Sequence, residues 1–398
     1  MNSRFPARLL IALVGAWRHF THPHRACRPT DPQRILIAHQ LLLGDAIMMT
    51  PLIAKLRRNH PDAAISMLIP PAYAPLYAGR PYGVSALPFD PRSLDSVAAL
   101  LRAGPFDLAL LPTESRLSWL ARAMGARWIA AFDGEPGRYK NFPIDEFRPF
   151  AAQPKAWGEL AAELADGSAP PPYRKADWPA PPCRDFALPD GAYVLLHVGA
   201  STPLKQWHPD NWRGLADWLT AQGRHVVWSC GRGEEKLIDT ADPDQRYPRY
   251  AGNLDLAQLW RLLAHARLVV CPDTGVTHLA HLAGTPSVVL YSSGNPALFG
   301  RGEFWREHPE EVVFSANFPC RNENLIFRRQ LKWGEHCGRT FRPAPNLGEN
   351  PTATQNPTNK ICAHPGCMDI IGLPTVIEAV AALLARTDGG AAGAVTPG

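Results

Sequence analysis

Long apolar runs are missing from this sequence. The most apolar stretch near the N-terminus, residues 9–17, is too short to cross a bilayer. No convincing small-residue cleavage site follows it, so it also fits a secretory signal peptide poorly. The eight cysteines are scattered along the chain, unlike those of a small disulfide-linked scaffold. Together these absences favour a cytoplasmic protein.

Several ligand-binding motifs are also missing. There is no G-x-x-x-x-G-K-[ST] segment, which excludes a P-loop. Residues 231–233, Gly-Arg-Gly, lack the third glycine of a dinucleotide fingerprint, so NAD binding is not supported. Cysteine and histidine residues near the C-terminus could suggest a zinc site, but their spacing matches no standard zinc finger. We interpret these thiols as structural, with no metal bound. The residues are Cys320, Cys337, Cys362, His364 and Cys367.

The composition fits a multidomain globular protein with a basic N-terminus. The 398 residues suggest two or three domains, and 46% of them are apolar. The formal charge is +5, and we expect no nucleic-acid partner. Two interpretations of the N-terminus stay open: an amphipathic segment on an anionic membrane surface, or a frayed end. The arginines concerned precede the first acidic residue, Asp31: Arg4, Arg8, Arg18, Arg25 and Arg28.

Apolar runs alternate with helical patterns in two stretches of similar length. This alternation predicts an α/β fold with parallel sheets that are covered on both faces. The expected strands are residues 35–39, 64–70, 106–111, 128–132, 193–199, 225–231, 268–271 and 287–291. The expected helices are residues 47–58, 93–102, 115–124, 209–222, 234–239, 256–266, 275–283 and 374–386.

Prolines and changes of composition suggest the domain boundaries. We expect a basic segment over 1–33, an N-terminal Rossmann-like domain over 34–150, a proline-rich linker over 151–190, a C-terminal Rossmann-like domain over 191–318, an irregular insertion over 319–372, a helix over 373–387 and a disordered tail over 388–398.

Ligands of open parallel sheets bind at the carboxyl ends of the strands. Gly44 and Asp45 follow the first strand, where Asp45 is either a helix cap or a functional carboxylate. Residues 271–286 turn from a strand into a helix, so Thr274, Thr277 and His278 mark either an ordinary helix start or a diphosphate site.

Two further loops carry charged residues. Lys205, in the loop after residues 193–199, is either a surface lysine or a group that neutralises a departing phosphate. Glu234 or Glu235 follows the next strand, where an acidic side chain can accept hydrogen bonds from ribose hydroxyls.

Taken together, four motifs resemble glycosyltransferase family 9, the bacterial heptosyltransferases of the lipopolysaccharide inner core. They are "LGDAIMMTPLIAKLRRNHPDAAI", "LLHVGASTPLKQWHPDNWRGLADWL", "YAGNLDLAQLWRLLAHARLVVCPDTGVTHLAHLAGTPSVVLY" and "CMDIIGLPTVIEAVAALL". The sequence departs from the family at residues 39–41, His-Gln-Leu, where Arg and Ser are usual, and at residues 291–300, which replace an "FGPTDP"-like segment.

The resemblance implies a GT-B fold, in which two Rossmann-like domains face each other across a cleft. It implies an inverting, metal-independent glycosyltransferase without a cofactor, with ADP-heptose as donor substrate and a lipid-linked saccharide at the inner-membrane surface as acceptor. It also implies catalytic roles for Asp45, the general base of the acceptor-side loop with Gly44, and for Lys205. The nucleotide-sugar positions carried over are Ser201, Thr202, Lys205, Glu234, Leu254, Asp273, Thr274, Gly275 and His278.

Two other functions remain open on the sequence. One is a nucleotide-sugar epimerase of the same fold, which needs no acceptor. The other is a non-catalytic two-lobed sugar-binding protein, which would carry an export signal and bind free sugar without turnover.

Overall fold

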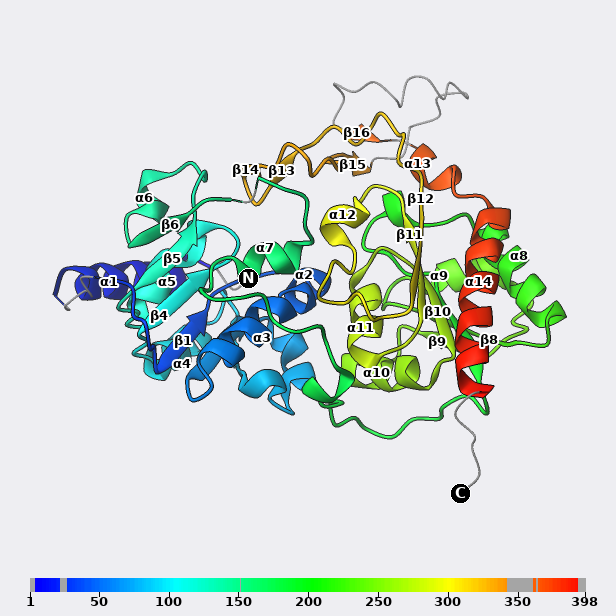
Figure 1. The fold of residues 1–398 in the computed structure, drawn as a ribbon, viewed down its shortest axis with the longest axis horizontal. Helices are drawn as coiled ribbons and strands as arrows, with labels where there is room; N and C mark the ends of the chain where they lie inside the picture. The colour runs from blue at the N-terminus through cyan, green and yellow to red at the C-terminus, as the bar shows by residue number, and fades with distance from the viewer. Residues whose placement is uncertain (1–3, 22–26, 151, 342–360, 363, 393–398) are drawn as a thin grey trace. The chain divides into compact units, whose positions relative to one another are not determined.

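The computed structural model describes residues 4–21, 27–150, 152–341, 361–362 and 364–392 (Figure 1). Arg25 of the basic segment, residues 342–360 of the expected insertion and residues 393–398 of the expected tail lie outside the described residues. The chain forms two compact units. The N-terminal unit contains Met1–Pro182 and Leu325–Lys332, and the C-terminal unit contains Cys183–Asn324 and Trp333–Gly398.

The N-terminal unit is built on a six-stranded parallel sheet in the order β3-β2-β1-β4-β5-β6. In the centre of the sheet, Ile35 pairs with Ile65 on one side and Leu108 on the other. All four expected strands are confirmed, and the two edge strands, β3 and β6, were not predicted. The bounds are β1 Arg34–Ile37, β2 Ala64–Ile69, β3 Ser85–Pro88, β4 Leu108–Leu111, β5 Ile129–Phe132 and β6 Glu146–Arg148.

Helices of the N-terminal unit differ from expectation mainly after β1. The helix predicted over residues 47–58 is two helices, because Pro51 lacks an N–H group and stands in the first turn of the second one. The first of them begins earlier, at Leu43, so that Gly44 and Asp45 lie inside its first turn. The bounds are α1 Phe5–Thr21, α2 Leu43–Met48, α3 Thr50–Asn59, α4 Leu94–Ala103, α5 Ser118–Ala123, α6 Arg138–Asn141 and α7 Trp157–Ala162.

The N-terminal segment is a packed helix. Ala7 and Gly15 of α1 are buried, and a side chain at Gly15 would bring its Cβ within 2.8 Å of the carbonyl oxygen of Trp119, which lies in α5. The frayed end that stayed open on the sequence is therefore wrong for Phe5–Thr21. In the part of the chain that the model describes, no helix is long and apolar enough to span a bilayer.

The expected proline-rich linker also contributes to this core. Trp157 in α7 and Trp178 are both buried, and the indole N–H of Trp178 donates to the carbonyl oxygen of Leu76 at 3.1 Å. At least this part of residues 151–190 is held in place by packing.

The C-terminal unit repeats the same strand order, read from the opposite edge: β12-β11-β10-β7-β8-β9. Its expected strands are confirmed, and again the two edge strands, β9 and β12, were not predicted. The bounds are β7 Tyr193–His197, β8 His225–Cys230, β9 Arg249–Ala251, β10 Leu268–Pro272, β11 Ser287–Tyr291 and β12 Glu310–Phe314.

Helices of the C-terminal unit bury a tryptophan-rich core that includes Trp212 and Trp228. Val376, Val380 and Leu383 of the last helix pack into the same core. That helix continues beyond Thr387, where we expected a disordered tail. The bounds are α8 Pro209–Ala221, α9 Glu235–Ala241, α10 Leu256–His265, α11 Gly275–Ala283, α12 Pro296–Phe299, α13 Gly366–Asp369 and α14 Leu373–Ala392.

The expected irregular insertion contains short strands. β13 Leu325–Ile326 and β14 Arg329–Gln330 form a hairpin that belongs to the N-terminal unit, although the residues on both sides of it belong to the C-terminal unit. β15 Thr340–Phe341 pairs with β16 Ile361–Cys362. The orange hairpin is labelled in Figure 1.

Candidate functional site

The strand order places one switch point in each sheet. The first and fourth strands of each unit are neighbours, β1 with β4 and β7 with β10, and their connections leave toward opposite sides of the sheet. Loops after these strands form the ligand-binding edge of a doubly wound sheet. The predicted loops around residues 44–45 and 273–278 follow β1 and β10 respectively.

Asp45 is a half-buried carboxylate at the edge of the N-terminal sheet. It is the third residue of α2, and Leu42 holds the N-cap position, so the cap that stayed open on the sequence is not its role. Trp157 fixes the backbone here, because its indole N–H donates to the carbonyl oxygen of Asp45 at 3.3 Å. Close packing of α7 on α2 requires Gly158, since a Cβ there would stand 1.7 Å from the carbonyl oxygen of Met48.

His39 lies between β1 and this loop. Its side chain is only 1% exposed, and its Nδ1 accepts from the backbone N–H of Leu41 at 3.3 Å. Among the described residues, Nε2 has no hydrogen-bond partner. Burial lowers the pKa of His39 to about 3, so this ring is neutral near pH 7. A neutral histidine thus stands close to the loop where the family usually carries a cationic arginine.

Arg329, from the hairpin, closes the carboxyl ends of β4 and β5. Its guanidinium donates to the carbonyl oxygens of Thr113 at 2.6 Å and Phe132 at 2.9 Å. Nη2 also lies 3.5 Å from Oε2 of Glu135, and both side chains are 1% exposed. Phe327 of the same hairpin packs on the Trp157 ring with centroids 4.5 Å apart. This contribution could not be predicted from the sequence, because the partners are about two hundred residues apart in the chain and no local pattern indicates the contact.

In the C-terminal unit, Lys205 and Asp273 form the centre of the site. The Lys205 ammonium donates to Oδ2 and to the backbone carbonyl oxygen of Asp273, both at 2.8 Å. The Asp273 side chain is 6% exposed and the Lys205 side chain 24%. The surface-lysine alternative is therefore wrong: Lys205 is bound in place next to the start of α11.

The start of α11 is a well-formed capping box. Thr274 is the N-cap, and its hydroxyl oxygen accepts from the backbone N–H of Val276 at 3.3 Å. Thr277 reaches back to the backbone N–H of Thr274 at 3.4 Å and donates to the carbonyl oxygen of Pro272. Gly275 is the first helical residue. The capping box satisfies the N–H groups of Thr274 and Val276, so the helix start beside Lys205 favours an anion through the positive end of its dipole.

Two further contacts shape the loops around Lys205. Ser292 donates to the carbonyl oxygen of Leu204 at 2.8 Å. A Cβ at Gly294 would stand 2.4 Å from Oδ2 of Asp273, so a larger residue there would displace the Asp273 carboxylate. These residues fall in the segment that departs from the family pattern, and the Ser-Ser-Gly run after β11 was the signal that could have revealed them.

His278 lies in the first turn of α11 and supplies no positive charge there. Its side chain is 4% exposed, and burial, reinforced by His281, lowers its pKa to about 3. The ring is therefore neutral near pH 7 and offers a hydrogen bond only. The neighbouring His281 is bound to Glu310, Nε2 to Oε2, at 2.6 Å.

The two acidic candidates bind different backbone groups. Oε2 of Glu234 accepts from the N–H of Gly231 at 2.8 Å, and a Cβ at Gly199 would stand 2.2 Å from it. Oε1 of Glu235 accepts from the N–H of Gly233, also at 2.8 Å, and this bond lowers the pKa of Glu235. Glu234 thus lies at the end of β7, from which the Lys205 loop starts.

The remaining candidates are less closely connected. Ser201 is exposed. The Thr202 hydroxyl accepts a long bond, 3.4 Å, from the N–H of Leu204, and the Thr202 carbonyl oxygen accepts from the N–H of Lys205 at 3.0 Å. Leu254 is half-buried in the loop after β9. Among the described contacts, no hydrogen bond or ion pair joins Glu234 or Leu254 to Lys205. The structure thus brings together Lys205, Asp273 and the start of α11, with Glu234 on a neighbouring strand end.

Comparison with known proteins identifies the family of the chain. The model of glycosyltransferase family 9 (heptosyltransferase) matches residues 95–325, more than half of the chain. Lipopolysaccharide heptosyltransferase 1 of Pseudomonas aeruginosa is 25% identical over 322 residues, which cover 72% of this chain and 85% of that protein.

Two solved structures share the fold along most of the chain. A glycosyl transferase family 9 protein from Veillonella parvula aligns with a TM-score of 0.65 and 16% identity, covering 89% of this chain and 98% of the other. The E. coli ADP-heptose lps heptosyltransferase II aligns with a TM-score of 0.63 and 19% identity, covering 89% and 99%. The chain belongs to glycosyltransferase family 9, the heptosyltransferase family, and is a glycosyltransferase with the predicted GT-B fold.

Proposed function

We propose that this enzyme transfers a heptose from ADP-heptose to a lipopolysaccharide-core acceptor, with inversion at the anomeric carbon and with Asp45 as general base. The donor and acceptor are those named for its relatives, a lipopolysaccharide heptosyltransferase and an ADP-heptose lps heptosyltransferase. The observation that carries the proposal is Lys205, held 2.8 Å from Asp273 beside the capped start of α11. This is a site for the diphosphate of a nucleotide sugar.

The reaction is a single in-line displacement. Asp45 takes the proton of an acceptor hydroxyl, whose oxygen forms a bond to the anomeric carbon. The bond from that carbon to the diphosphate oxygen breaks on the opposite face, and the nucleoside diphosphate leaves with the electron pair. One carboxylate suffices, because inversion needs no covalent enzyme intermediate and the leaving group is a stable anion.

Lys205 and the positive end of the α11 dipole stabilise the charge that develops on the leaving diphosphate. In the structure Asp273 pairs with Lys205 and orients it. A bound diphosphate competes with Asp273 for this ammonium. Part of the positive charge of Lys205 therefore becomes available to the leaving group only when the donor substrate is bound. Neutral His278, at the same helix, contributes a hydrogen bond without charge.

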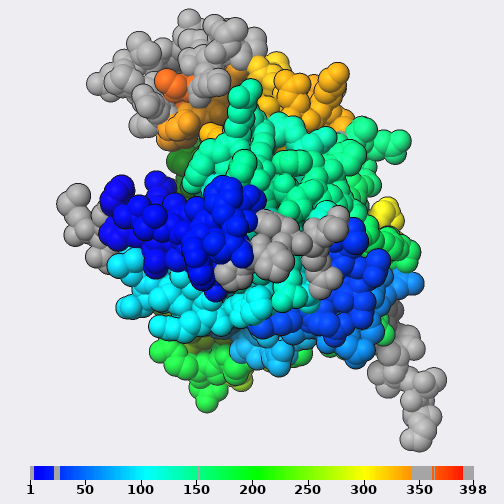
Figure 2. All heavy atoms as spheres, turned by 90° about the vertical axis from the view of Figure 1, so that its left-hand side faces the viewer, coloured from blue at the N-terminus to red at the C-terminus, as the bar shows by residue number. Residues whose placement is uncertain are grey.

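A lipid-linked acceptor also accounts for the exposed face of α1. Its outer face carries five large apolar side chains at helical spacing, four of them more than half exposed. Exposed Phe142 lies beside them, with its ring centroid 6.3 Å from that of Phe20. The helix crosses the face shown in Figure 2, in dark blue. The apolar residues are Phe5, Leu9, Leu13, Trp17 and Phe20. Exposed Arg4 and Arg8 are their neighbours in the sequence, and exposed Arg138 is four residues before Phe142. We propose that this surface rests on an anionic membrane.

The first experiment tests the base. Purified protein is incubated with ADP-heptose and a heptose-deficient core acceptor, and product formation is followed by mass spectrometry. Asp45→Asn should slow turnover by roughly 10²–10⁴-fold while binding of the donor stays near normal. Asp62→Asn, an exposed acid of the same unit, is the matched control. Full activity in Asp45→Asn, or a product with the anomeric configuration of the donor, would contradict the mechanism.

A second experiment tests the membrane surface. Sedimentation with anionic vesicles should recover the wild-type protein, and the double variant Leu9→Glu/Leu13→Glu should remain in solution. Both side chains point outward, 47% and 62% exposed, so the fold should tolerate the change. Equal sedimentation of both proteins, or a wild type that forms oligomers through this face in place of binding vesicles, would refute the proposal.

A further inference from the structure

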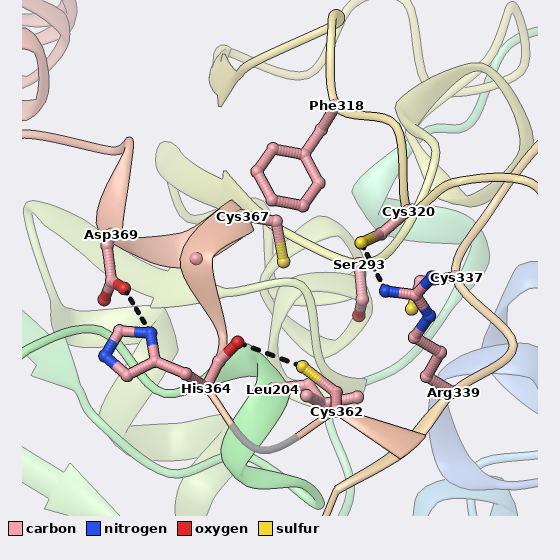
Figure 3. A pocket seen from close by; sticks show the side chains of 11 residues that line it. Leu204, Ser293, Phe318, Cys320, Cys337, Arg339, Cys362, His364, Cys367 and Asp369 are labelled. Carbon is pink, nitrogen blue, oxygen red and sulfur yellow. Dashed lines mark hydrogen bonds and ion pairs between the residues drawn. The ribbon is translucent and has the colours of Figure 1, made fainter. Parts of the chain in front are cut away.

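Four of the eight cysteines line one cavity of the C-terminal unit. The cavity has a volume of about 160 Å³. Its thiols come from separate stretches of chain: Cys320 follows β12, Cys337 follows the hairpin, Cys362 lies in β16 and Cys367 in α13. All four are free thiols. Figure 3 shows the sulfur atoms of Cys320, Cys362 and Cys367 directed toward the same central space.

This arrangement differs from that of ordinary buried cysteines. Cys230 and Cys271 are each a single thiol at the end of a core strand, with apolar neighbours on the same strand. The four clustered thiols instead surround an open space, which forfeits the packing contacts that a hydrophobic core supplies. A group of thiols around a space is better explained by something that the thiols bind.

Charge gives a second, independent indication. Arg321 is 6% exposed, and its described hydrogen bonds run to the carbonyl oxygens of Ser292, Ser315 and Ala316. Its guanidinium also lies over the ring of Phe314. None of these carries a negative charge, and a buried cation without an anion is costly. Cys320, Cys337 and Cys367 lie close enough to interact electrostatically with this guanidinium.

Arg339 provides a second cation at the same place. It is 8% exposed, and its Nη1 donates to the sulfur of Cys320. Two buried guanidinium groups therefore lie close to these four thiols. The surroundings favour a cluster that carries negative charge.

In place of the metal-free interpretation that the sequence favoured, we propose that Cys320, Cys337, Cys362 and Cys367 bind one thiolate-preferring metal ion, either zinc or iron. Four cysteine ligands in a tetrahedron are a standard site for these metals. Each thiol releases its proton to solvent as its sulfur binds, so a divalent ion with four thiolates has a net charge of −2. Arg321 and Arg339 balance that charge, and the N–H of Arg339 remains as a hydrogen bond to the sulfur of Cys320.

Binding requires the sulfur atoms to move inward. Among the described residues, no three histidine, cysteine or acidic side chains already stand in the arrangement of a finished metal site. The sulfur of Cys362 donates to the carbonyl oxygen of His364 at 3.0 Å, and that of Cys320 accepts from Arg339. Rotation of these side chains about their Cα–Cβ bonds exchanges such weak bonds for metal–sulfur bonds.

The site would act as a structural staple. Cys320 precedes the hairpin that carries Arg329, and Cys337 follows it. A metal ion bound to both would hold the two ends of this segment together. The N–H of Cys337 also donates to the carbonyl oxygen of Ser293 at 2.9 Å, next to the Ser292 that holds the Lys205 loop. None of the four thiols takes part in the proposed sugar transfer.

The test is the metal content of the purified full-length chain. Elemental analysis should find about one zinc or iron per chain. Cys337→Ser and Cys367→Ser should each lose most of it, whereas Cys183→Ser, a half-buried cysteine elsewhere in the unit, should retain it. Protein without either metal, or a Cys337→Ser/Cys367→Ser double variant that keeps the full content, would overturn the proposal.

Cobalt substitution keeps the test decisive if the serine variants fail to fold. Wild-type protein that is stripped with a chelator and reloaded with cobalt should show the intense thiolate-to-cobalt absorption and the visible bands of a tetrahedral site. Weak bands of an octahedral oxygen site, or disulfides between these cysteines in the native protein, would refute it. Sugar transfer is measured separately, so an active but metal-free enzyme would contradict the metal site alone.

Discussion

Replacing Arg329 should detach the hairpin from the N-terminal unit. The Arg329→Met variant keeps most of the side-chain volume but removes the donors to the carbonyl oxygens of Thr113, Phe132 and Asp133. It also removes the cation that lies 3.5 Å from Glu135. Because these groups are buried at the carboxyl ends of β4 and β5, the loss falls on the part of the sheet that borders the predicted acceptor loop.

Two energy ranges set the expected loss of stability in Arg329→Met. A buried acceptor that loses its partner costs about 1–3 kcal/mol, and breaking a buried ion pair costs about 3–5 kcal/mol. The full sum is not reached, because the hairpin can lift away and let water reach the carbonyl groups. Glu135 also keeps Lys140, whose ammonium is 3.6 Å from Oε1. We therefore expect a loss of about 3 kcal/mol in the free energy of unfolding, or roughly 6–12 °C in Tm.

Thermal unfolding and amide hydrogen exchange measure this effect. Exchange should accelerate in peptides that contain β4, β5 and the hairpin, and stay unchanged in the C-terminal sheet. Arg328→Met is the matched control, because Arg328 is the exposed neighbour in the same hairpin. If the two variants unfold within about 0.5 kcal/mol of each other, Arg329 does not anchor the hairpin and the reasoning fails.

Two other expectations follow from the site. Trp157→Phe removes the hydrogen bond to the backbone of Asp45 and should lower kcat by roughly fivefold, for a bond worth about 1 kcal/mol, with KM for the donor unchanged; Trp178→Phe, which loses a comparable indole bond elsewhere in the unit, should leave kcat intact. The pKa of His39 is lowered from 6.5 to about 3, so the unfolded chain takes up its proton first and stability falls as the pH drops below 6.5. His39→Gln should make this pH dependence shallower by about 1.4 kcal/mol per pH unit, while exposed His225→Gln should not. The free energy of unfolding is measured with urea from pH 6.5 to pH 4. If it changes equally with pH in the wild type and in His39→Gln, His39 is not a buried neutral ring.

Much of the fold was predictable because central strands of parallel sheets are apolar on both faces. The runs that became β1, β2, β4, β5, β7, β8, β10 and β11 all stand out in the sequence for this reason. The four strands that were missed, β3, β6, β9 and β12, are the edges of the two sheets. β6 and β9 have only three residues each and none of them is buried, so their sequences carry no strong apolar pattern.

The site was predictable to the extent that it follows strand ends. Lys205, Asp273 and Thr274 lie in loops at the carboxyl ends of strands in one unit, and the structure joins them directly. The neutral state of His278 could not be predicted, because its pKa depends on burial, which a loop sequence does not reveal. The contributions of Trp157 and Ser292 were missed because their hydrogen bonds run to backbone atoms of distant segments.

The amino-acid sequence by itself determined the two α/β sheets, the family and the loops that carry the candidate residues, because apolar periodicity and short motifs are local properties of the chain. Only the tertiary structure decided that Arg329 belongs to the sheet of the N-terminal unit, that His39 and His278 are neutral, and that four scattered cysteines share one cavity. Burial and contacts between residues far apart in the chain set these properties, and no stretch of sequence contains them.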